Sequence, residues 1–473
     1  MLAISTLCPI DTLSAQVSIN ADGTDPDPSA IMDLMSNNMG FLVPRMEQSE
    51  RLAISSPAGG LLLYDNGPDN GGMYYNAGAP DLPNWTRLNT IIQETADICD
   101  RRIPIDSAEN NNGTFSINQP GSYYFTRNIS IDQSNGNNLD GITIDADDVT
   151  LDLNGFTLEG DFSTSNRTDD GIFILGDQDN IVIKNGVIRN WGGDGVNALN
   201  CDNCTFVDLL VEGNDGDGIL ADFGAIIYQC VARGNAVDGL EGDDNTIIYD
   251  CEASNNGDNG IETSEGGRVI NCTATGNASD GIDVAPGSRV EGCVAAENGI
   301  YGIDLALGGQ VLNCTANLNG RNGIDIASSC LARFNTANNN GTCVAAGTCS
   351  LSQLDDGKAG SGIYTFSNAQ VMDNVCRNNF YGIRVSSLDT FVADNIVTGN
   401  SHAGLTLSST GSFAIRNRAH NNGFTPIPTS EDVPGNFSFT TDNSFGPIID
   451  VSSVAGNLLT IPGINNVYAN FIY

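Results

Sequence analysis

Cysteine recurs at a fixed interval of 21 residues through the middle of the chain, at Cys230, Cys251, Cys272, Cys293 and Cys314. Other positions keep the same spacing: an asparagine follows each cysteine by five residues, and a glycine follows it by nine. A constant period of about 20 residues is typical of stacked repeats and not of independent domains. This repeat therefore constrains the fold more than any other feature of the sequence.

The period continues beyond the last of these cysteines. Asparagine takes over the cysteine column after the array, and an insertion interrupts the spacing once, with the column running through Asn335, Asn374, Asn395 and Asn417. Within each period, three short alternating apolar runs are separated by glycine and asparagine, which favour turns. Helical repeats need about 33 residues or more, so 21 residues indicate three strands per turn of a solenoid. Parallel coils stack about 4.8 Å apart, which aligns each column into a ladder. Asparagine ladders gain amide hydrogen bonds.

The "DGI" runs, the asparagine–glycine turns and the regular coils resemble the right-handed parallel β-helix repeat family of the pectin-lyase-like superfamily. The resemblance covers residues 103–423 at least, starting from "IPIDSAENNNGTFSINQPGSYYF". It implies an all-β chain that forms a single-stranded right-handed parallel β-helix. We assign the β-helix to residues 101–423, with an insertion at 341–361, and a C-terminal cap to residues 424–473.

Residues 17–100 lie outside the 21-residue register. Their segments "GFLVPRM", "AISSPAGGLLLYD" and "MYYN" resemble a module of secreted Bacteroidetes proteins and of phage fibre-like chains. That resemblance implies an attachment or assembly module and an oligomer. The alternative is a small β-rich cap that covers the open end of the solenoid. Residues 1–16 end in "LSAQ", which resembles the tail of a signal peptide, so we expect the protein to be secreted or on the cell surface.

The charge of the chain limits its partners. Nineteen basic residues face 58 acidic ones, giving a formal net charge of -39. Such a surface repels nucleic acid phosphates and anionic membranes, and no apolar run reaches the 18 residues of a membrane span. We therefore expect neither a nucleic acid partner nor a membrane span. Self-association and contact with a polysaccharide are the expected partnerships.

An acidic column follows each "GI" pair, at Glu241, Glu262, Asp283, Asp304 and Asp325, with Asp280 in the column beside it. The isoleucines alternate inward, so these carboxylates point outward on one wall. Like charges about 4.8 Å apart repel by about 1 kcal/mol in water and by about 3–4 kcal/mol at an effective dielectric near 20. Bound Ca²⁺ would relieve this repulsion, which makes Ca²⁺ the candidate cofactor. The alternative is a solvated acidic face.

Candidate catalytic residues lie near the insertion. Asp304 and Asp325 share a wall with Arg384 and Tyr364, and neighbouring coils supply either carboxyl separation that glycosidases use. The family resemblance implies that lyase chemistry needs Ca²⁺-binding acids and a basic residue. Lysine is nearly absent from the chain, and we expect both histidines, His402 and His420, to lie on the surface.

The cysteine columns have a structural interpretation. A disulfide needs Cβ atoms about 3.8 Å apart, and coils about 4.8 Å apart hold them too far from one another, so we expect Cys230 to Cys314 to be buried reduced thiols. Cys343 and Cys349 in the insertion form a candidate disulfide. The "CDNC" pair at 201–204 is either a local disulfide or two free thiols.

Two functions remain open from the sequence. The first is a secreted or cell-surface structural and adhesive element, fibre-forming or carbohydrate-contacting. The alternative is a polysaccharide-active enzyme, either a lyase or a tailspike-like glycosidase, with its site on the "GI-x" wall near residues 341–361. The regular repeat and the scarcity of lysine and histidine favour the first. The fold alone does not decide, because function depends on sites placed upon it.

Overall fold

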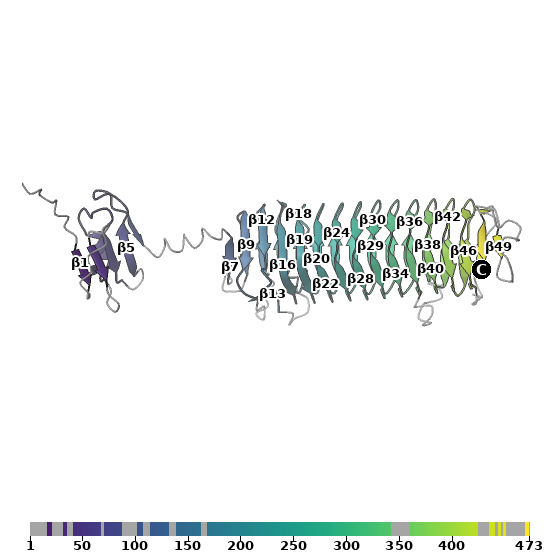
Figure 1. Cartoon of the computed structure of the whole chain (residues 1–473), viewed down its shortest axis with the longest axis horizontal. Coiled ribbons are helices and arrows are strands. Elements are labelled where there is room, and N and C mark those ends of the chain that lie inside the picture. Colours follow the sequence, from purple (N-terminus) through teal and green to yellow (C-terminus); the bar gives the residue numbers. More distant parts are fainter. Residues whose placement is uncertain are drawn as a thin grey trace, which may run out of the picture. The chain divides into compact units, whose positions relative to one another are not determined.

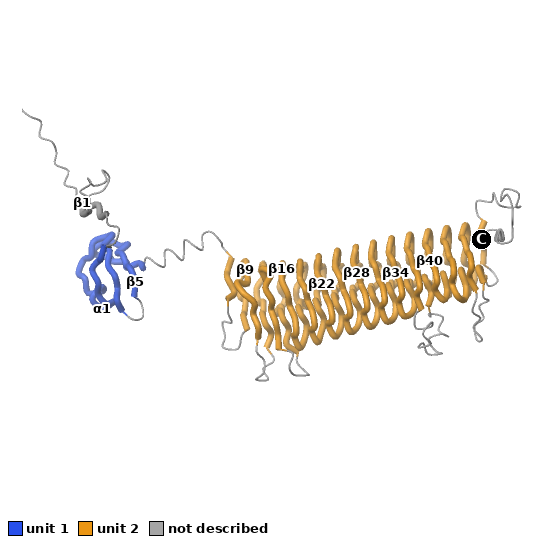
Figure 2. The backbone as a smooth tube through the Cα atoms, turned by 60° about the horizontal axis from the view of Figure 1, so that its bottom comes forward, with its two compact units in different colours: residues 1–101 blue, residues 102–473 orange. Residues whose placement is uncertain are grey.

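The computed structural model divides the chain into two compact units, residues 1–101 and 102–473 (Figure 2). It describes residues 17–20, 32–35, 41–67, 71–87, 102–106, 114–131, 139–161, 168–341, 360–423, 435–439, 443–445, 448–450 and 469–472. The candidate disulfide of Cys343 with Cys349 lies outside these residues. Each unit is treated by itself below.

The described residues of the first unit form two small sheets and one short helix. Strands β1 (Val17–Asn20) and β2 (Met32–Met35) pair in parallel, and a four-stranded sheet is formed by β3 (Arg45–Met46), β4 (Leu62–Asp65), β5 (Gly72–Asn76) and β6 (Trp85–Arg87). Helix α1 (Gln48–Leu52) starts with a capping box between Glu47 and Glu50. The Arg51 guanidinium binds the buried carboxylate of Asp65 at 3.1 Å and lies over the ring of Tyr74. This ion pair joins the helix to the sheet.

The second unit is a parallel β-solenoid, as the period predicts (Figure 1). Its first wall is a 14-stranded parallel sheet. The strands of this wall are β8 (Phe115–Ile117), β11 (Ile142–Ile144), β14 (Ile172–Ile174), β17 (Val196–Ala198), β20 (Ile219–Ala221), β23 (Leu240–Gly242), β26 (Ile261–Thr263), β29 (Ile282–Val284), β32 (Ile303–Leu305), β35 (Ile324–Ile326), β38 (Ser361–Thr365), β41 (Tyr381–Val385), β44 (Ala403–Leu407) and β47 (Gly435–Phe439).

The other two walls are joined into one 28-stranded sheet, because β16 (Val182–Arg189) and β19 (Thr205–Glu212) each run through both walls. The second wall contains β7 (Ile103–Ile105), β9 (Gly121–Phe125), β12 (Val149–Asp152), β21 (Ile226–Tyr228), β24 (Ile247–Tyr249), β27 (Arg268–Ile270), β30 (Arg289–Glu291), β33 (Gln310–Leu312), β36 (Leu331–Arg333), β39 (Gln370–Met372), β42 (Phe391–Ala393), β45 (Phe413–Ile415) and β48 (Ser444–Phe445).

The third wall follows the cysteine column. Its strands are β10 (Ile129–Ser130), β13 (Thr157–Glu159), β22 (Val231–Arg233), β25 (Glu252–Ser254), β28 (Thr273–Thr275), β31 (Val294–Ala296), β34 (Thr315–Asn317), β37 (Thr336–Asn338), β40 (Val375–Arg377), β43 (Ile396–Thr398), β46 (Arg418–His420), β49 (Ile448–Asp450) and β50 (Asn470–Ile472). A two-stranded extension adds β15 (Gln178–Asp179) and β18 (Cys201–Asp202).

Residues that pair between neighbouring coils of the solenoid are one sequence period apart. Glu241 pairs with Glu262, and Glu262 with Asp283, each 21 residues on. Inward-facing aliphatic side chains such as Ile261 and Ile282 are fully buried in one continuous core. The glycine column is needed because the coils approach closely there: a Cβ on Gly281 would lie 2.5 Å from the amide nitrogen of Asn298.

Asparagine ladders stitch the coils together inside the turns. Asn298 illustrates the pattern: its Oδ1 accepts the backbone N–H and the side-chain amide of Asn277, at 3.1 and 3.0 Å. Its own amide donates to Asn319 of the next coil, at 3.0 Å, and to the carbonyl of Ala274. Each ladder runs in one direction along the solenoid. Near the C-terminus, the side-chain oxygens of three asparagines accept the final backbone N–H groups: Asn436, Asn443 and Asn470.

Candidate functional site: the acidic wall

The outward face of the first wall carries the chemistry that the sequence pointed to. Strands β23 to β35 alternate between a buried aliphatic and an outward carboxylate, so the register stacks the acids directly over one another. We call this face the acidic wall. Its outer column comprises Glu241, Glu262, Asp283, Asp304 and Asp325. The first four are half-buried, and Asp325 is only 2% exposed, where the Asn322 amide donates to its Oδ2 at 3.0 Å.

A second acidic column lies beside the first, where the chain enters each strand of the wall. The carboxylate of one coil accepts the backbone N–H of the residue in the next coil. Asp217 accepts from Asp238 at 2.7 Å, and Asp238 accepts from Asn259 at 2.6 Å. Asp280 accepts from Tyr301 in the same way, at 2.6 Å. Hydrogen bonds from the backbone of the next coil therefore hold the carboxylates of the second acidic column in place.

Burial raises the pKa of several of these acids, because the charged form loses hydration. The pKa of Asp238 rises to about 8, with the negative charge of Glu262 as a further cause. Burial likewise raises the pKa of Glu241 and Asp283 to about 7, and nearby carboxylates add to both effects. Asp280 rises to a pKa of about 7 and Asp217 to a pKa of about 6, mainly through burial. At neutral pH the wall therefore mixes protonated and ionised carboxyls.

Three of the acids converge closely enough to share a cation. Carboxylate oxygens of Asp217, Asp238 and Glu241 lie within 4.8 Å of one another. Within the described residues this is the one such group of three, and the other acids proposed as calcium ligands do not form another. Those acids are Glu262, Asp280, Asp283, Asp304 and Asp325. The sequence shows the same grouping, since Asp217 and Asp238 are one period apart and Glu241 follows three residues later.

The candidate catalytic residues occupy the later coils of the same wall. Asp325, Tyr364 and Arg384 are paired across the three adjacent strands β35, β38 and β41. Tyr364 is 4% exposed, and the Arg384 guanidinium lies 4.7 Å from the ring centre of Tyr381. Asp304 precedes them on β32. These contacts place the tyrosine within the packed wall and the guanidinium against an aromatic ring.

The expectation that His402 lies on the surface is wrong. Its side chain is fully buried, stacked on Phe380 at 5.2 Å and meeting Tyr381 edge-on at 5.0 Å. The coil that carries His402 follows one with two consecutive aromatics, and their rings cover the imidazole. A turn residue read in isolation gives no sign of this, because the partners belong to the preceding coil. His420 ends β46 and is exposed.

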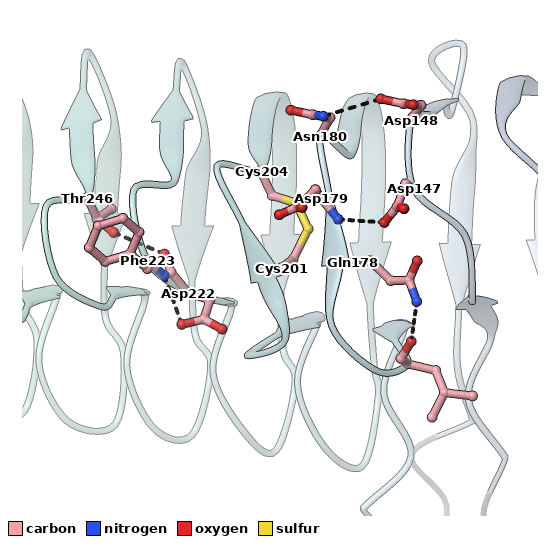
Figure 3. The surroundings of a disulfide bond; sticks show 11 residues. Asp147, Asp148, Gln178, Asp179, Asn180, Cys201, Cys204, Asp222, Phe223 and Thr246 are labelled. Atoms are coloured by element: carbon pink, nitrogen blue, oxygen red, sulfur yellow. Dashed lines mark hydrogen bonds between the residues drawn. A yellow bond between two sulfur atoms is a disulfide. The ribbon is translucent and has the colours of Figure 1, made fainter.

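The cysteines fall into two kinds. Cys201, the first residue of β18, forms a disulfide with Cys204, next to the Asp147–Asp179 and Asp148–Asn180 hydrogen bonds (Figure 3). The five cysteines of the 21-residue column are buried free thiols. Asn335, Asn374, Asn395 and Asn417 continue that column as a buried amide ladder.

Family models match both parts of the chain. Residues 106–268 and 224–356 match the model described as a right handed beta helix region, which together covers more than half of the chain. The chain belongs to the right-handed β-helix family. Residues 19–104 match the model of a phage tail like trimerisation region, which confirms the resemblance of the N-terminal module to phage fibre-like chains.

Solved structures are similar to this chain at low sequence identity. The A-module of Azotobacter vinelandii mannuronan C-5 epimerase AlgE4 is 13% identical with a TM-score of 0.36, covering 72% of this chain and 88% of that one. The Dettilon tailspike protein is 11% identical with a TM-score of 0.32, covering 66% and 60%. The GH87 alpha-1,3-glucanase of Streptomyces thermodiastaticus is 11% identical with a TM-score of 0.31, covering 70% and 62%.

No curated protein matches the sequence. Among the described residues, no helix has the length and apolarity needed to span a membrane.

Proposed function

We propose that this protein is a secreted or cell-surface fibre element, in which residues 19–104 join three copies and each β-helix serves as a rigid shaft. The match of residues 19–104 to a trimerisation region, directly followed by the β-helix, carries this proposal. A solenoid with a continuous buried core and ladder-bonded coils supplies the stiffness that a shaft needs. Contact with a surface polysaccharide fits the same role.

Exposed apolar side chains on the first unit support self-association. Phe41 and Leu42 are 68% and 69% exposed, Leu52 is 63% exposed and Leu82 is 77% exposed. Apolar surface that is exposed on a small unit is available for contact with a partner. A second and third copy of this chain are the partners that the family match supports.

The oligomeric state tests the proposal. Light scattering coupled to size exclusion should give a trimer for the full chain across a tenfold or wider concentration range. The double variant Phe41→Asp/Leu42→Asp should dissociate. Leu307→Asp, which changes a 54% exposed leucine on the β-helix, is the matched control and should remain trimeric. If the full chain were a monomer at every concentration, the proposal of a trimeric fibre would be wrong.

A polysaccharide-active enzyme is the second candidate, favoured by the alignment of Asp325, Tyr364 and Arg384 on neighbouring strands. Burial of Tyr364 and stacking of Arg384 on Tyr381 favour a packing role for the same residues. Incubation with a panel of acidic polysaccharides separates the two functions. Unsaturated products that absorb in the ultraviolet, lost in Arg384→Ala, would establish lyase activity.

A further inference from the structure

The five stacked cysteines form a thiol ladder, defined as Cys230, Cys251, Cys272, Cys293 and Cys314. Cys251 is 4% exposed and the other four are at most 1% exposed, and none of the five is in a disulfide. Register places each thiol one coil from the next, and the side chains of adjacent cysteines interact. The ladder therefore aligns soft sulfur donors along the solenoid.

Two of the sulfurs in the ladder also accept a backbone hydrogen bond from the preceding coil. The backbone N–H of Cys230 donates to the Sγ of Cys251 at 3.4 Å, and the N–H of Cys272 donates to the Sγ of Cys293 at the same distance. Cys314 ends the array differently, since its N–H donates to the Oδ1 of Asn335 at 2.9 Å. Five thiols in a row provide at most two adjacent pairs that share no thiol, with one thiol left over.

We propose that the thiol ladder is a binding site for soft monovalent cations of the Cu(I) and Ag(I) class, with one ion between each pair of thiols. Thiolate sulfur selects such cations. If the zinc–thiolate bond of about 2.3 Å is taken as a guide to metal–sulfur bond lengths, a linear two-coordinate ion needs sulfurs about 4.6 Å apart. Parallel coils repeat about 4.8 Å apart, so the spacing that forbids a disulfide suits a linear S–metal–S unit.

Charge balance favours a monovalent ion. A buried net charge is costly unless it is compensated. One thiol S–H bond breaks, its proton leaves to solvent and one sulfur–metal bond forms in its place. The second thiol keeps its proton and coordinates through a lone pair. Each pair therefore exchanges one proton for one monovalent cation, and the core stays neutral.

The surface above the first pair offers a route for a cation. A shallow groove there is lined by Asp208, Asp250 and Glu252, with Cys230 and Cys251 among its lining residues. Carboxylates at a groove raise the local concentration of cations. Cys251, the residue of the ladder with the largest exposed fraction, lines this groove.

The count of silver ions retained by variants of the full chain tests the proposal. Each protein is incubated with Ag⁺, passed through gel filtration in excess methionine as a weak competitor, and measured by native mass spectrometry. Cys251→Asn should retain one ion fewer than the natural chain, and Cys251→Asn/Cys293→Asn two fewer. Asparagine is chosen because Asn335 occupies the same column in a later coil and forms hydrogen bonds there to the next coil. The column therefore accepts an asparagine side chain.

Two control variants test whether each ion needs two adjacent thiols of the ladder. Cys272→Asn leaves two adjacent pairs, Cys230 with Cys251 and Cys293 with Cys314, and should lose no ion. Cys376→Ser removes a buried thiol outside the ladder and should also lose none. Thiols outside the ladder are the same in every ladder variant, so for those variants only the difference from the natural chain counts. Proton release of about one per ladder ion is the independent readout. Equal silver counts in the natural chain and the double variant, or an equal loss in Cys272→Asn and Cys251→Asn, would overturn the proposal.

Discussion

Replacing Asp238 by asparagine should stabilise the protein at high pH and leave its stability at low pH nearly unchanged. Burial and the charge of Glu262 raise the pKa of Asp238 from 3.8 to about 8. At a pH between these two pKa values, Asp238 carries a proton in the folded protein and has lost it in the unfolded chain. The free energy of unfolding therefore falls as pH rises from about 4 to about 8. Asparagine does not ionise and removes this loss.

The size of the effect follows from the shift. One pKa unit corresponds to about 1.4 kcal/mol, so the full shift of Asp238 would lower the free energy of unfolding at pH 8 by about 5–6 kcal/mol before screening by solvent is considered. Water at the outer side of the wall screens part of this cost, and we expect a net gain of about 2–3 kcal/mol for Asp238→Asn at pH 8. The hydrogen bond from the Asn259 N–H is kept, because Asn259 plays the same accepting role toward Asp280.

Urea unfolding at pH 4.5, 6 and 8 measures this difference. Asp215→Asn makes the same chemical change on an exposed turn nearby and is the matched control. The reasoning would be refuted if Asp238→Asn destabilised the protein at pH 8. A gain of equal size at pH 4.5 and pH 8 would refute it as well, since the effect would not then arise from ionisation.

Three further outcomes are expected. Asn298→Ala removes the acceptor of the buried Asn277 backbone N–H and of one hydrogen of its side-chain amide, and it should cost about 3 kcal/mol or more in urea unfolding. The exposed Val294→Ala should cost less than about 1 kcal/mol. Gly281→Ala places a methyl group 2.5 Å from the Asn298 amide nitrogen and should lower stability by about 1–3 kcal/mol; a neutral result would contradict the close approach. Millimolar Ca²⁺ should raise the melting temperature more at pH 8.5 than at pH 5.5, because the three-carboxylate cluster must lose its protons to bind, and chelator should reverse the rise. An identical shift at both pH values would count against binding at that cluster.

The fold was readable from the sequence because every coil repeats the same contacts. Columns spaced by 21 residues specified the register and the number of strands per coil, and the structure confirms both. The N-terminal resemblance was also confirmed, since it rested on short local motifs.

The chemistry of the acidic wall was harder to predict from the sequence. Alternation predicted that the acids point outward, but it says nothing about how closely the neighbouring ladder covers them, and that cover raises their pKa values. The burial of His402 depends on Phe380 in the preceding coil, in the region where the regular columns give way to aromatics. Sequence reasoning thus succeeds where each coil copies its neighbour and fails where one coil differs.

The one-directional asparagine ladders have a consequence for how such a protein can change in size. Each repeating coil donates to its successor the same hydrogen bonds that it accepts from its predecessor, as Asn277, Asn298 and Asn319 illustrate. Duplicating or deleting one whole period leaves each remaining joint as before, so the length of the rod is variable in steps of about 4.8 Å. Only the terminus that closes the ladders, with Asn436, Asn443 and Asn470, has no interchangeable copy.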